Sequence, residues 1–153
     1  MQDRYPDHII DLIVYLVRRM HIGMNLRDIK IEKFRNYNHS EISAAYSWLI
    51  HNYETSDRQK LKRAKDHRPA PRALHPSERS HIAPDAYGYM LELYYLGIID
   101  AAGMERLIEY AMFRLDGRTE LSDIKQWAGG LLFESEGEGF HNHHLLKGTE
   151  NIN

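Results

Sequence analysis

The stretch HSEISAAYSWLI, residues 39–50, has the spacing of an amphipathic helix and closes the first group of helices that the sequence predicts. Asn38 precedes it and Glu41 follows three residues later, the pattern of a capping box in which each side chain bonds to the other residue's backbone amide. We therefore predict a helix over 39–53. Its buried face is expected to consist of Ile42, Ala45, Tyr46, Leu49 and Tyr53.

Working outward from this helix, apolar residues recur with a period near 3.6 in most of the chain. The sequence predicts an all-α protein whose N-terminal part, 1–54, is a helix-turn-helix-like trihelix. A basic linker over 55–75 joins it to a C-terminal three- or four-helix unit over 76–133, and 134–153 is expected to be a disordered tail. The remaining helices are predicted at 7–21 and 27–36, from Pro76 and again from Pro84 to Gly97, at 101–115 and at 121–133.

The helix predicted over 101–115 has the clearest apolar pattern after the cap that Asp100 offers. The positions expected to face inward are Met104, Leu107, Ile108, Ala111, Met112 and Leu115. In the helix predicted over 27–36, Ile29 and Phe34 are expected to face the core, with Ile31 as a further candidate. No alternating apolar pattern follows residue 54, so a two-stranded wing is expected to be short or absent.

Composition narrows the class of protein. The 153 residues include no cysteine, which excludes disulfides, thiol nucleophiles and cysteine-based zinc sites. No apolar run approaches the roughly 18 residues of a membrane span, so we expect a soluble, cytoplasmic protein that does not contact membranes. Phosphate-binding loops, hydrolase elbows and zinc-protease motifs are absent, and we expect neither enzymatic activity nor a cofactor.

Charge is distributed unevenly. Residues 58–72 carry a net charge of +6, whereas the whole chain carries −2. Such a segment is typical of contacts with the phosphates of DNA or RNA, although a solvated linker or a contact with an acidic protein fits equally. The candidate nucleic-acid-binding residues are Arg58, Lys60, Lys62, Arg63, Lys65, Arg68 and Arg72.

The helix over 39–53 is a poor candidate for a DNA recognition helix because it contains neither Lys nor Arg. Its outward positions are expected to be His39, Ser40, Ser43 and Ser47, with Trp48 or His51 beside them. A structural or protein-contact role is therefore favoured over contact with nucleic acid.

Tyrosines crowd the helix predicted from Pro84. They occupy more than one face, so some are expected at a protein interface, with a homodimer as one form; partly buried core edges are the alternative. These candidate interface residues are Tyr87, Tyr89, Tyr94 and Tyr95. The cluster His141, His143 and His144 lies in the predicted tail, where we expect adventitious metal affinity and no metal site.

Several motifs in order resemble the Smg family, small bacterial proteins of unassigned molecular function. In the second half they are Pro76–Glu78, Gly88, Met104–Ile108 and Leu121–Lys125; in the first half they are Glu41, Ile42, Ala45, Trp48 and Leu49. The resemblance covers roughly residues 8–133. It implies a cytoplasmic bacterial protein and supplies no catalytic residue and no cofactor.

The chain departs from that family in its basic middle segment and in Gly129 and Gly130, which replace large apolar residues of the last helix. Two functions remain open. The first is a non-catalytic, nucleic-acid-associated regulatory or accessory protein that acts through residues 58–72. The alternative is a protein–protein adaptor or homodimeric module that does not bind nucleic acid.

Overall fold

The computed structural model describes residues 5–30, 34–54 and 69–134. The predicted all-α class is confirmed, since the described residues contain no strand and only one isolated bridge, between Ile82 and Thr119. The α-helices are α1 (Tyr5–His21), α2 (His39–Leu49), α4 (Pro76–His81), α5 (Pro84–Tyr95), α6 (Ala101–Phe113) and α7 (Leu121–Glu134). A 3-10 turn, η1 (Leu26–Asp28), follows α1, and a π-helix, η3 (Ile50–Glu54), extends α2.

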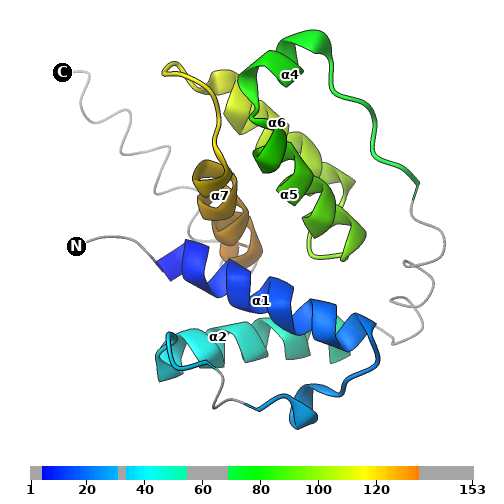
Figure 1. The fold of residues 1–153 in the computed structure, drawn as a ribbon, viewed down its shortest axis with the longest axis vertical. Helices are drawn as coiled ribbons and strands as arrows, with labels where there is room; N and C mark the ends of the chain where they lie inside the picture. The colour runs from blue at the N-terminus through cyan, green and yellow to red at the C-terminus, as the bar shows by residue number, and fades with distance from the viewer. Residues whose placement is uncertain (1–4, 31–33, 55–68, 135–153) are drawn as a thin grey trace.

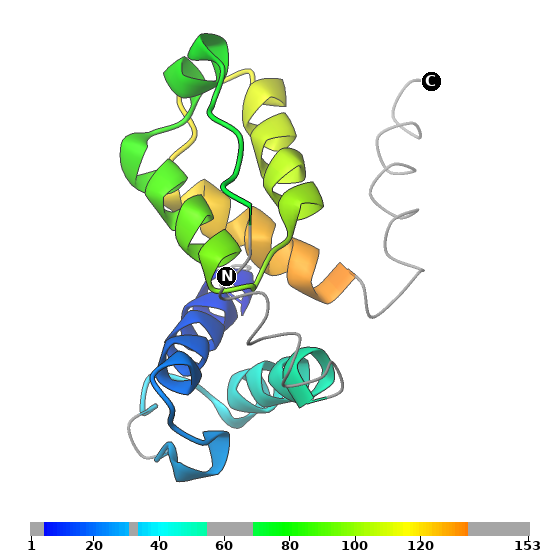
Figure 2. The same cartoon turned by 90° about the vertical axis from the view of Figure 1, so that its right-hand side faces the viewer.

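Helix α1 lies at the centre of the fold, between α2 on one side and α7 on the other (Figure 1). Its side chains Ile10, Ile13, Leu16 and Val17 are fully buried. Helices α5 and α6 pack against α7, and the two views place α2 and α4 at opposite ends of the molecule (Figure 2). Buried side chains from both halves form one cluster. The predicted linker lies mostly outside the described residues, so the division into two units stays a prediction.

Two ion pairs tie α1 to the C-terminal helices. Asp11 pairs with Lys125 of α7 at 3.0 Å, and Arg18 pairs with Glu92 of α5. The two α1 residues are seven positions apart and therefore lie on one helix face. Because their charges are opposite, sliding α1 along its neighbours would bring like charges together. The pairs thus help to set the position of α1 in the fold.

The predicted helix starts are confirmed at the level of single hydrogen bonds. The Asn38 side chain accepts from the Glu41 amide at 2.8 Å, and the Glu41 carboxylate accepts from the Asn38 amide at 2.8 Å. Asp100 accepts from the Gly103 amide at 2.8 Å. These caps satisfy backbone donors that the first turn of a helix leaves free, which is why local sequence identified them.

The α-helix predicted over 27–36 is wrong. Ile29 has extended backbone angles after η1, and residues 34–38 form turns. Ile29 and Phe34 are nevertheless buried, and Phe34 packs edge-on against Tyr15 with ring centroids 5.6 Å apart; Ile31 lies outside the described residues. The expected trihelix has only two α-helices, α1 and α2, in the described residues.

Three side-chain directions also differ from prediction. Trp48 is buried, whereas it was considered an outward position of α2. Helix α6 ends at Phe113, two residues before the predicted end, and Arg114 is extended. Leu115, predicted to face the core, therefore leaves the helical pattern and is 97% exposed, while Met112 is 37% exposed.

Gly88 and Gly117 should respond in opposite ways to alanine. A Cβ at Gly88, within α5, would have no atom within 4 Å, so Gly88→Ala is expected to raise the free energy of unfolding by about 0.5–1 kcal/mol. Gly117 has a φ of 71°, where Gly117→Ala is expected to cost about 1 kcal/mol. Thermal denaturation followed by circular dichroism distinguishes the two. Equal shifts of the melting temperature in the same direction for both variants would contradict this prediction.

Within the described residues, no helix combines the length and the apolar character that crossing a membrane requires.

Candidate interaction site

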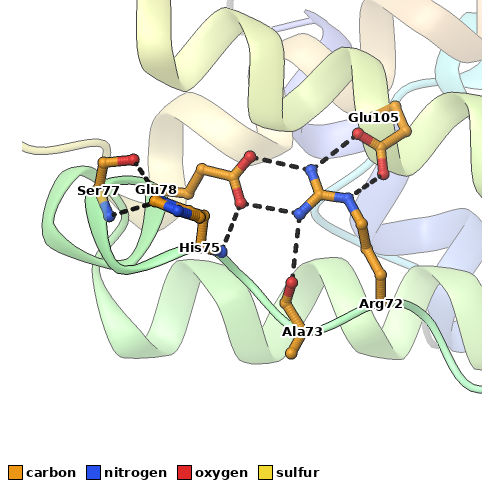
Figure 3. A network of polar contacts seen from close by, with 6 residues as sticks. All are labelled: Arg72, Ala73, His75, Ser77, Glu78 and Glu105. Atoms are coloured by element: carbon orange, nitrogen blue, oxygen red, sulfur yellow. Dashed lines mark hydrogen bonds and ion pairs between the residues drawn. The ribbon is translucent and has the colours of Figure 1, made fainter.

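Of the seven predicted nucleic-acid-binding residues, the structure describes Arg72; Arg58, Lys60, Lys62, Arg63, Lys65 and Arg68 lie outside the described residues. Arg72 is not a free cation. Its guanidinium lies between two carboxylates of its own chain, Glu78 of α4 and Glu105 of α6 (Figure 3). The sequence could not reveal this, because Glu105 is 33 residues away.

The Arg72 guanidinium uses every hydrogen-bond donor it has. Nε and NH2 donate to the Glu105 carboxylate at 2.7 and 2.9 Å, and NH2 and NH1 donate to the Glu78 carboxylate at 2.9 Å each. NH1 also donates to the Ala73 carbonyl at 3.2 Å. An arginine has five N–H donors, so none is left for a phosphate unless one of these bonds breaks.

This arrangement anchors the chain that leads into α4. Leu74 is buried, and the Tyr94 hydroxyl donates to the Pro69 carbonyl at 2.7 Å. Glu78 also accepts from the His75 amide at 2.8 Å, which completes the capping box of α4. Arg72 therefore joins α4 to α6, and a phosphate would have to compete with these two carboxylates for its guanidinium.

The acid stability of the protein should depend on Glu78. Its hydrogen bonds with Arg72, and then with the His75 amide, lower the pKa of Glu78 from 4.5 to about 2. A lowered carboxyl pKa stabilises the folded state fully above the unfolded-state value and loses that contribution as the pH falls towards 2. Glu78→Gln should therefore flatten the loss of unfolding free energy between about pH 4.5 and 2 in acid titrations of stability. Glu109→Gln, which removes an exposed carboxylate of α6, is the control; an equal slope in wild type and Glu78→Gln would contradict the prediction.

Three of the four tyrosines predicted at an interface contact the protein itself. Tyr94 is buried, and its ring meets Tyr95 edge-on at 5.5 Å. Tyr89 is half-buried, donates to Asp11 at 3.5 Å and lies 5.5 Å from the Lys125 ammonium; burial, and then the charge of Asp11, raise the pKa of Tyr89. Tyr87 is half-buried against the core, and Tyr95, 53% exposed, is the most exposed of the four; their role at an interface stays a prediction.

Helix α2 presents a polar, uncharged face to solvent. Its exposed side chains include His39, Ser40, Ser43 and Ser47, as predicted, and His51 of η3 is also exposed. No lysine or arginine lies on α2. This face lacks the cations from which most affinity for nucleic acids comes.

Metal binding finds no support in the part of the chain that the structure describes, where no three His, Asp or Glu side chains are grouped to hold an ion. The predicted adventitious cluster, His141, His143 and His144, lies outside that part.

Sequence reasoning missed a group of exposed apolar side chains at the end of α6 and in the connection to α7. Met112, Phe113 and Leu115 are 37%, 75% and 97% exposed. We call these three residues the α6–α7 surface. The turn at Asp116–Gly117 was the available indication, because a helix must end before it and the residue preceding it then leaves the helical face.

The chain that carries the α6–α7 surface is held in place. Arg114 pairs with Asp123 of α7, and its Nε donates to the Asp116 carbonyl at 2.7 Å. Phe113 and Leu115, on either side of Arg114, are 75% and 97% exposed, so their side chains extend into solvent. Further on, the Thr119 amide donates to the His81 carbonyl at 2.7 Å. The exposure of Leu115 therefore belongs to a fixed segment.

Exposed charged residues of both signs lie close in sequence to the α6–α7 surface or in the neighbouring helix α4. Arg118 lies in the same connection and reaches the backbone carbonyl of Arg79 in α4 at 3.5 Å. Glu109 is one helical turn before Phe113, and Asp116 follows Leu115. The side chains of these four residues are exposed, and none forms an ion pair with another described residue. They are Arg79, Glu109, Asp116 and Arg118. This contrasts with Arg18, Arg72 and Lys125, which pair within the chain.

Comparison with known families gives a match over residues 9–145 to the family described as Protein of unknown function (DUF494). The chain belongs to this family. Searches of curated proteins and of solved structures found no match. Membership of DUF494 agrees with the expectation of a small family without an assigned function, and it transfers no activity or partner to this chain.

Proposed function

We propose that this DUF494 member is a non-catalytic protein-interaction module that binds its partner through the α6–α7 surface. The observation that carries the proposal is the exposure of Leu115 and Phe113 on a segment fixed by hydrogen bonds and an ion pair. Covering a large apolar side chain contributes about 1.5–3 kcal/mol. A segment that is already ordered loses little conformational entropy on binding, so more of that contribution appears as affinity.

Site-specific photocrosslinking tests this function. A photoreactive amino acid replaces Phe113 in one variant and Ala102, an exposed residue at the opposite end of α6, in the control. We expect a crosslinked product, with any protein or with a second copy, from position 113 and none from position 102. Absence of a product at 113, or equal yields at both positions, would refute the proposal.

A second candidate function is association with DNA or RNA through the basic segment. The supporting observation is the net charge of +6 between residues 58 and 72, of which Arg72 is committed to Glu78 and Glu105. If five cations contact phosphates, the logarithm of the binding constant should fall with that of the salt concentration with a slope of about −4.5.

Fluorescence anisotropy with labelled duplex DNA and single-stranded RNA in a salt series tests this candidate. Replacing Lys60, Lys62, Arg63 and Lys65 by glutamine should abolish binding, whereas Leu115→Asp should leave it unchanged. No binding by the wild-type protein at low salt would exclude nucleic-acid association.

The narrower assignment to the Smg type, with a bacterial and cytoplasmic origin, is also a proposal. It is supported by the order of the motifs from Glu41 to Lys125 and by the extent of the DUF494 match. Fractionation of the source cells and immunodetection of the protein would test its location.

A further inference from the structure

We infer that the two carboxylates bound to Arg72 form an autoinhibitory clamp, which withholds this arginine from the phosphates of a nucleic acid until one carboxylate is displaced. The inference rests on the second candidate function, association with DNA or RNA through the basic segment, and adds its regulation. Arg72 is the last cation of that segment, and its side chain is 46% exposed, so a phosphate can approach it from solvent.

The clamp changes the charge that a polyanion meets. Residues 58–72 carry a formal charge of +6, and the carboxylates of Glu78 and Glu105 reduce it to +4 where they bind Arg72. The guanidinium and its two partners together carry −1, so this end of the segment repels a phosphate although the sequence presents a cation there. With every N–H donor engaged, Arg72 offers a ligand no hydrogen bond while the clamp is closed.

The two carboxylates of the clamp are held unequally (Figure 3). Glu78 has a side chain only 15% exposed, and its carboxylate also accepts from the His75 amide at 2.8 Å, which completes the cap of α4. Glu105 has a side chain 54% exposed, and among the described residues its carboxylate bonds to Arg72 alone. Displacing Glu78 would break the start of α4, whereas displacing Glu105 breaks one ion pair in contact with solvent. Glu105 is therefore the carboxylate that a phosphate replaces.

A phosphate fits the place that Glu105 leaves. The Glu105 carboxylate accepts from Nε and NH2 of Arg72 at 2.7 and 2.9 Å, so both bonds lie on one edge of the guanidinium. A phosphate accepts two parallel N–H bonds from arginine in the same manner as a carboxylate. The exchange keeps the bonds between Arg72 and Glu78, so α4 stays joined to Arg72 while α6 is released from it.

Fluorescence anisotropy with a labelled DNA duplex measures the effect of opening the clamp. Glu105→Gln removes the charge of the exposed carboxylate and should tighten binding about five- to tenfold at about 0.1 M salt, because one further phosphate contact forms. The log–log salt slope should steepen by about 0.9. Glu109→Gln makes the same change of net charge one turn further along α6 and should change binding less than about twofold. An equal effect of both variants, or no gain from Glu105→Gln, would overturn the inference.

Removal of Arg72 tests whether the gain depends on this arginine. Arg72→Gln should weaken DNA binding less than about twofold in the wild-type background, where the clamp is closed, and about five- to tenfold in the Glu105→Gln background, where it is open. The same loss in both backgrounds would show that Arg72 is always available to DNA and would refute the clamp. Thermal transitions check that each variant folds. If Arg72→Gln does not fold, the comparison of Glu105→Gln with Glu109→Gln still decides.

The outcomes separate the clamp from the candidate function on which it rests. No binding of DNA at low salt by the wild-type protein or by Glu105→Gln refutes both. Binding by the wild-type protein that Glu105→Gln leaves unchanged refutes the clamp and keeps nucleic-acid association. Binding that tightens in Glu105→Gln and loses this gain with Arg72→Gln supports both.

Discussion

Replacing Ile13 by alanine is expected to lower the free energy of unfolding by about 2–5 kcal/mol, the cost of removing a buried aliphatic side chain and leaving a cavity. Ile13 is fully buried at the middle of α1, the helix that contacts both α2 and α7. Because α1 packs against helices of both halves, the loss of stability should lower the unfolding midpoint of both halves of the protein.

The chain offers a direct readout, since it contains two tryptophans, one in each half. Trp48 is buried in α2, and Trp127 of α7 packs edge-on against Tyr110 at 5.8 Å. Trp127→Phe leaves Trp48 as the single fluorescent reporter, and Trp48→Phe leaves Trp127. In urea, the fluorescence transition of each single-tryptophan protein should coincide with its loss of helical circular dichroism, and Ile13→Ala should lower the midpoint of both proteins by the same amount.

Ile22→Ala is the matched control, because Ile22 lies beyond the end of α1 and is 70% exposed; its effect should stay within about 0.5 kcal/mol. A shift of the Trp48 transition alone would mean that the two predicted helical units unfold independently. That result would support the domain division drawn from the sequence and contradict a cooperative role for α1.

Features set by neighbouring residues were predictable from the sequence. The caps at Asn38 and Asp100, and the helix starts at Pro76 and Pro84, depend on backbone amides at most three residues away. The side chains of Asn38 and Asp100 bond in the structure as the local pattern indicated, and both prolines occupy the first turn of a helix. The apolar period of α6 likewise identified Met104, Leu107, Ile108 and Ala111 as buried.

Features set by distant residues were not predictable. The region over 27–36 follows contacts of Ile29 and Phe34 with the core, which override the helical pattern. Arg72 belongs to a charged run in the sequence, but its partners come from α4 and α6. The composition of the tyrosine-rich segment indicates a protein interface, yet the Tyr94 hydroxyl is bonded to the carbonyl of the distant residue Pro69. Local pattern therefore located the helices, while tertiary contacts decided which side chains remain available for a partner.

Thr119→Val is expected to raise the free energy of unfolding by about 1–2 kcal/mol. Thr119 is fully buried, and its hydroxyl has no hydrogen-bond partner in the structure. A buried hydroxyl without a partner loses its bonds to water on folding and gains none in return. Valine has the same branched shape and places a methyl group where the hydroxyl stood. The gain should be measured by urea denaturation of the two proteins.

Two comparisons identify the cause of that gain. Thr119→Ser keeps the hydroxyl and removes the methyl group, so it should cost about 1 kcal/mol of apolar burial. The backbone of Thr119 bonds to His81 and Ala83 at 2.7 and 2.9 Å, and valine preserves both bonds. The α6–α7 connection should therefore stay in place. Destabilisation by valine would show that the hydroxyl has a partner, and that the connection depends on it.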